Sequence, residues 1–269
     1  MSNAVPPLLT TLVDDAAVFP PGSATLADAI PAHEAHRQSW YAQLIGPLLV
    51  PVADREAVPP GTAIGLIGEP PPDLAPSVRQ VECPVAKRGE DPLPGIERMA
   101  PLIRKNGMLQ WYLEVPLAWG LMTGLDAIAA LRGDGLPVAA KFRTGGLAAE
   151  LFPTPVELAA VICACRDRDL PFKLTAGLHH AVRHTDAETG LVHHGFLNIL
   201  AAVLAAVDSA EPGDLALLLA STEGHPLADL VRPQLHRERP LWVGFGSCSV
   251  QDPVGDLVTL GLLDRPVAA

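Results

Sequence analysis

The chain has 269 residues, of which 49% are hydrophobic and 18% charged, so it can bury a large core and extensive disorder is excluded. Its formal net charge of −11 at pH 7 excludes general nucleic-acid binding, because no basic stripe is available to neutralise phosphates. The length and the absence of a long linker predict one domain over residues 1–269.

Strand-like and helical segments alternate along the chain. Strands are expected at residues 12–19, 44–52, 63–68, 78–85, 109–115, 138–142, 172–175 and 241–245. Helices are expected at residues 25–37, 95–105, 125–131, 154–168, 196–207, 213–220, 227–231 and 256–263. The strands are mostly apolar throughout, which is typical of a parallel sheet covered by helices.

Eight such strands predict a (β/α)8 barrel of the TIM type, and a doubly wound open parallel sheet is the alternative. Residues 53–76 are the irregular part, since their proline clusters leave little room for full helices.

Ionisable side chains fall near the carboxyl ends of these strands, where active sites of such barrels collect. Residues two apart share one face of a strand, so Lys141 points the same way as Arg143, and Lys173 the same way as Thr175. If the two lysines share one rim, each raises the cost of charging the other. We therefore expect a lowered pKa and a reactive amine. The acids expected at the same rim are Asp14, Asp15, Glu82 and Glu114.

The two lysine segments carry a family resemblance. Pro137-Val-Ala-Ala-Lys-Phe-Arg-Thr-Gly-Gly146 and Pro171-Phe-Lys-Leu-Thr-Ala-Gly-Leu-His-His180 resemble the lysine pair of the deoxyribose-phosphate aldolase group of class I aldolases. The resemblance implies a lyase without a cofactor, in which Lys141 forms a Schiff base and Lys173 lowers its pKa. This chain departs from the family at Phe142-Arg143 and at Leu178-His179-His180, and Glu82 or another acid would replace the family's aspartate. Over its whole length the chain more generally resembles bacterial barrel proteins.

The expected substrate is a small anionic carbonyl metabolite. Glycines after two strands expose backbone N–H groups to an anion, and barrels often bind phosphate after their last strands. Glu114, His180 or Asp15 would move protons. The residues expected to hold the substrate are Arg143, Thr175, Gly145, Gly146, Gly246, Ser247 and Glu82.

A cluster of histidines indicates an alternative function. Five of the nine histidines lie between residues 179 and 194. They allow a metal-dependent hydrolase or lyase, although no His-x-His or His-Glu-x-x-His spacing occurs. A single inward-facing histidine is favoured over a metal site. A barrel that binds a metabolite without turning it over is the third hypothesis.

The cysteines, the first residues and the most apolar run indicate where the protein is located and which partners it has. No Cys-x-x-Cys pair occurs among Cys83, Cys163, Cys165 and Cys248, which favours a reducing cytoplasm, with Cys248 as a buried structural thiol. Residues 1–7 lack the pattern of a secretory signal, and the apolar run 196–207 is too short to span a bilayer. We expect no membrane partner, and the apolar composition leaves a homo-oligomer open.

Overall fold

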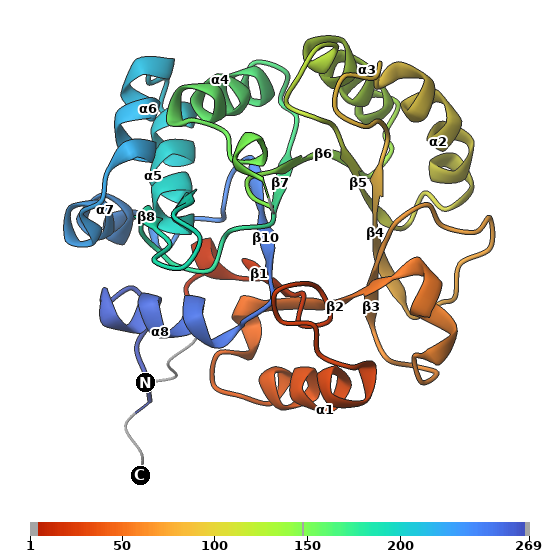
Figure 1. Ribbon diagram of the computed structural model, residues 1–269, viewed down its shortest axis with the longest axis horizontal. Coiled ribbons are helices and arrows are strands. Elements are labelled where there is room, and N and C mark those ends of the chain that lie inside the picture. The colour runs from red at the N-terminus through yellow and green to blue at the C-terminus, as the bar shows by residue number, and fades with distance from the viewer. Residues whose placement is uncertain (1–4, 147, 267–269) are drawn as a thin grey trace.

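The computed structural model describes residues 5–146 and 148–266. Eight parallel strands close into a barrel with helices around it (Figure 1), in the order β1-β2-β3-β4-β5-β6-β7-β10. The strands are β1 (Val13–Asp15), β2 (Ile45–Pro51), β3 (Ile64–Ile67), β4 (Val78–Pro84), β5 (Gln110–Glu114), β6 (Val138–Arg143), β7 (Phe172–Thr175) and β10 (Trp242–Ser247). Because β1 pairs with both β2 and β10, the sheet has no open edge. The predicted (β/α)8 barrel is confirmed, and the open sheet is wrong.

The helices follow the expected segments. They are α1 (Leu26–Arg37), α2 (Leu93–Lys105), α3 (Leu121–Gly133), α4 (Pro155–Arg166), α5 (Phe196–Val207), α6 (Pro212–Ala220), α7 (Gly224–Val231) and α8 (Gln251–Thr259). The start of α4 is set by a capping box. The Thr154 hydroxyl accepts the N–H of Glu157, whose carboxylate accepts the N–H of Thr154.

The connections on either side of β3 are shorter than a full helix. A 3₁₀ segment, Val52–Ala57, leads from β2 towards β3, and no helix lies between β3 and β4 in this described part of the chain. The expected irregularity over residues 53–76 is therefore present. The proline clusters explain it, because proline lacks the N–H that a helix interior needs.

The histidine-rich segment forms a small hairpin that the sequence pattern did not predict. Strands β8 (His184–Thr185) and β9 (Val192–His193) pair antiparallel between β7 and α5, outside the barrel. None of the helices in the described ranges has both the length and the apolar content needed to cross a bilayer.

The space between strands and helices is apolar, whereas the barrel interior is not. Outside the strands, Phe245 stacks between Phe196 and Trp242. The interior of such barrels is usually filled by layers of bulky branched side chains. Here one side of the interior carries glycine, and a Cβ at Gly46 would lie 1.8 Å from the Asp14 carboxylate. The opposite side supplies long charged side chains, which form the candidate site.

Candidate active site

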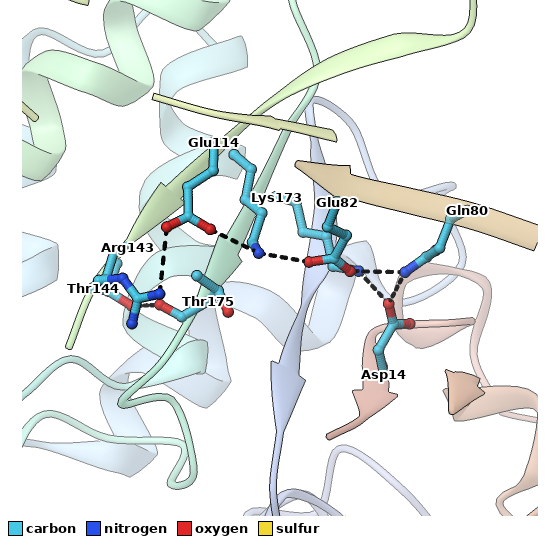
Figure 2. Close-up of polar contacts among 9 residues, drawn as sticks. Asp14, Gln80, Glu82, Glu114, Arg143, Thr144, Lys173 and Thr175 are labelled. Atoms are coloured by element: carbon cyan, nitrogen blue, oxygen red, sulfur yellow. Dashed lines mark hydrogen bonds and ion pairs between the residues drawn. The ribbon is translucent and has the colours of Figure 1, made fainter. Parts of the chain in front are cut away.

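Charged side chains of alternating sign form a continuous row across the barrel interior (Figure 2). They come from five different strands, and the row runs from one mouth of the barrel towards the other. In order, its members are Asp14, Lys173, Glu82, Lys141, Glu114 and Arg143.

The two lysines meet at one carboxylate in the middle of this row. Lys141 and Lys173 are register partners on β6 and β7, so their side chains enter the barrel side by side. Lys141 Nζ lies 2.7 Å from Glu82 Oε2, and Lys173 Nζ lies 2.6 Å from Glu82 Oε1. Lys141 also contacts Glu114 Oε2 at 2.9 Å, and Lys173 also pairs with Asp14. The predicted convergence of the lysines is thus present, with an acid between them.

The carboxylates reverse the predicted shift of the lysine pKa values. Burial alone would lower the pKa of Lys141, but Glu82 and Glu114 raise it above the ordinary value. The pKa of Lys173 is likewise raised, by Asp14 and Glu82 against the effect of burial. The prediction of a lysine with a lowered pKa is therefore wrong for this state of the protein. It considered the two amines without the acid that separates them.

Glu82 is the acid of the row whose two carboxylate oxygens both contact a lysine. Its side chain is buried, each oxygen contacts one lysine, and Gln80 Nε2 donates to Oε1 at 2.9 Å. Burial would raise the pKa of Glu82, but Lys141 and Lys173 lower it to about 2. Glu82 therefore holds the lysines in place and is unavailable as a direct substrate ligand, contrary to its predicted binding role.

The two aspartates of β1 point in opposite directions, Asp14 into the barrel and Asp15 away from it. Asp14 enters the barrel, where Gln80 Nε2 donates to it at 2.6 Å. Asp15 instead faces α1, with its Oδ2 3.0 Å from His33 Nδ1, and its Oδ1 accepts the N–H of Ala17. Side chains alternate along a strand, so Asp14 occupies the inward position, and Asp15, which was predicted to be catalytic, faces away from the lysines.

A cavity of about 400 Å³ opens at the carboxyl-terminal mouth. Its wall includes Glu114 and Arg143, whose side chains are 18% and 45% exposed. Lys141 lies directly beneath Glu114 and is almost fully buried. Two cations that sequence reasoning missed, Lys87 and Arg88, also line the cavity. They directly follow β4 in the chain, and this position after the carboxyl end of a strand could have indicated that they lie at this mouth of the barrel.

The other residues predicted to bind substrate lie elsewhere. A Cβ at Gly145 would come within 2.9 Å of Gly177 Cα, so this glycine serves the close packing of two loops. Ser247 is buried, and its hydroxyl donates to the Ser249 carbonyl at 2.8 Å. Thr175 and the glycines at 146 and 246 are likewise not among the residues that line this cavity. Of the predicted binding residues, Arg143 is the one on its wall.

The histidine segment stays outside the barrel. His180, which was predicted to transfer protons at the lysines, is half exposed and instead lies 3.3 Å from Asp256 of α8. His194 is buried against the Pro153 carbonyl, and burial lowers its pKa to about 4. Within residues 5–146 and 148–266, no three His, Cys, Asp or Glu side chains gather as a metal site.

One thiol lies near a possible base. Cys248 Sγ is 3.7 Å from His179 Nδ1, a neighbour that the sequence did not reveal. Burial raises the pKa of Cys248 and lowers that of His179, so both groups are neutral at neutral pH. Cys248 was predicted to be a buried structural thiol, but its side chain is only partly buried.

No protein-family model, curated protein or solved structure matches this chain. The resemblance to class I aldolases therefore stays a prediction, and function has to be argued from the geometry of the site.

Proposed function

We propose that the protein is an enzyme that binds a small anionic carbonyl compound at the carboxyl-terminal mouth and forms a Schiff base with Lys141. The observation that carries the proposal is the order Arg143, Glu114, Lys141 from the cavity inward. This order provides an anion-binding cation, a proton carrier and an amine along one line.

The anionic end of the substrate would meet Arg143. Its Nη2 lies 3.4 Å from Glu114 Oε1, a weak contact that leaves most guanidinium donors free for a carboxylate or phosphate. Lys87 and Arg88 add positive charge to the same cavity. The carbonyl end would then point towards Glu114 and the amine below it.

Lys141 must lose a proton before it can react, and Glu114 Oε2 lies 2.9 Å away to receive it. Arg143 helps to lower the pKa of Glu114, so an anion that draws Arg143 away makes Glu114 a better base. The free amine adds to the carbonyl carbon, and loss of water gives an iminium. This iminium withdraws electrons from the adjacent carbon–carbon bond, which is the chemistry of a lyase.

Trapping with borohydride tests the proposal. Incubation with pyruvate and borohydride should leave a covalent adduct on Lys141, located by peptide mass mapping. Lys141→Arg keeps the positive charge between Glu82 and Glu114 but lacks the amine, so it should fold and give no adduct at this position. Lys105, which is exposed on α2 and lies outside this cavity, provides an internal control for ordinary surface amines. An adduct on Lys105 without one on Lys141, at saturating pyruvate, would reject the Schiff-base proposal.

One observation favours the second candidate, a barrel that binds a metabolite without turnover. The Lys141 ammonium is ion-paired with two carboxylates, and this arrangement suits a fixed charge as well as a nucleophile. This candidate predicts that a small anion stabilises the protein through Arg143, whereas Lys141 is never modified. The same trapping experiment therefore separates the two functions.

A further inference from the structure

The amino-terminal mouth of the barrel holds a second cavity of about 400 Å³, at the end opposite the proposed active site. In most barrels of this type the interior is packed with side chains. Here a space remains, and Gly46 and Gly244 are among the residues that line it. Gly244 has a φ of 134°, and a Cβ there would lie 2.5 Å from the Leu12 carbonyl oxygen. Residues with a side chain are therefore excluded at this position.

The wall of this cavity carries excess positive charge. Lys173 and Asp14 line it and neutralise one another, and Gln80 also donates to Asp14. Arg239 lines it too, and no carboxylate of the described residues lies within 4.0 Å of its guanidinium. Its N–H groups are held by backbone carbonyls of Leu8, Thr10, Thr11, Trp242 and Val243. Arg239 is partly buried, and a partly buried cation without a carboxylate in contact favours an anion nearby.

Tyr112 supplies a donor in the same wall. Its ring lies under Lys173, with Nζ 4.6 Å from the ring centroid, and the residue lines the cavity. Its hydroxyl makes no hydrogen bond to another residue in the described part of the chain. Burial raises the pKa of Tyr112 to about 12, so this hydroxyl keeps its proton and can donate.

We infer that the amino-terminal mouth is a second binding site, which takes a small organic monocarboxylate. The Arg239 charge would attract the carboxylate, the Tyr112 hydroxyl would donate to it, and Val243 would lie beside the short carbon chain. A cavity of this volume is within the range of small-molecule sites. The inference does not depend on the proposed Schiff-base chemistry, because it concerns other residues at the other mouth.

Matched probes test the charge requirement. Propionate and propionamide have nearly the same shape but differ in charge, and neither carries the ketone or aldehyde that an amine needs. We expect propionate to raise the melting temperature in a saturable manner and propionamide to leave it unchanged, with sodium chloride keeping the ionic strength constant. Equal shifts with both probes, or no saturable shift with propionate, would overturn the inference.

Variants locate the site. In the Arg143→Gln background, which removes the anion-binding cation of the opposite mouth, Val243→Trp fills the amino-terminal mouth and should abolish the propionate shift, whereas its matched control Val243→Ala should retain it. Tyr112→Phe removes only the hydroxyl and should weaken propionate binding roughly tenfold. If Val243→Trp fails to melt cooperatively, Tyr112→Phe is the variant that shows whether propionate binds at the amino-terminal mouth. Arg143→Gln changes the opposite mouth and should bind propionate normally. Loss of binding in Arg143→Gln, with Tyr112→Phe unaffected, would place the anion at the carboxyl-terminal mouth and refute the second site.

Discussion

Glu82 and Lys141 form a buried ion pair at 2.7 Å in the middle of the barrel, and the other oxygen of Glu82 binds Lys173 at 2.6 Å. One carboxylate thus bridges two ammonium groups that lie on adjacent strands. Removing one partner from a buried ion pair is costly, because the remaining charge is left without compensation. The stability of this barrel therefore depends on Glu82 more than on any surface acid.

Glu82→Gln should destabilise the protein by about 3–5 kcal/mol, the usual cost of breaking a buried pair. Urea unfolding followed by circular dichroism measures the change. The matched control is Glu97→Gln on the exposed face of α2, which should stay within about 0.5 kcal/mol of the parent protein. Similar effects of the two substitutions would show that Glu82 does not stabilise the lysine pair.

The same carboxylate predicts a loss of stability in acid. The pKa of Glu82 is lowered from 4.5 to about 2 on folding, so its contribution is present above pH 4.5 and is lost as the pH falls towards 2. The raised pKa of Asp14 acts in the opposite direction and offsets part of this loss. Urea midpoints should therefore fall below pH 4.5, and less steeply for Glu82→Gln. Parallel curves for the two proteins would contradict this assignment.

Most of the fold could be predicted, because each strand is marked by a short apolar run and the turn residues that flank it in the sequence. Segment 172–175 coincides with β7, and all eight barrel strands lie where apolar runs bounded by turn residues placed them. The hairpin around His184 and His193 was missed, since each of its strands has two residues and leaves no periodic pattern.

The candidate site was predicted less well, because its properties depend on contacts between distant residues. The convergence of Lys141 and Lys173 followed from strand alternation and adjacency. The position of Glu82 between them, 59 residues before Lys141 in the chain, depends on how β4 faces β6 across the interior. This long-range contact sets the pKa values, so their direction could not be deduced from either lysine segment alone.

Asp15 and His33 join β1 to α1 outside the barrel, so they should affect stability without affecting the lysines. Asp15→Asn weakens a buried hydrogen bond with His33 and should cost roughly 1–3 kcal/mol. Its borohydride adduct on Lys141 should form at the parental rate. A large fall in the adduct rate of Asp15→Asn relative to the parent protein would show that Asp15 takes part in the chemistry.

The rate of adduct formation should rise with pH. Glu82 and Glu114 raise the pKa of Lys141 above the ordinary lysine value, so only a small fraction of the protein has a free amine at pH 7. Initial rates of adduct formation with pyruvate, in aliquots reduced with borohydride, should therefore increase about tenfold per pH unit between pH 7 and pH 10.

Glu114→Gln separates two roles of this acid in the same assay. The substitution removes one of the two carboxylates that raise the pKa of Lys141, so the midpoint of the pH profile should move to lower pH. It also removes the group that receives the Lys141 proton, so the plateau rate should fall by roughly 100-fold. A lower midpoint with an unchanged plateau would leave Glu114 as an electrostatic neighbour only, because another base would then be taking the proton.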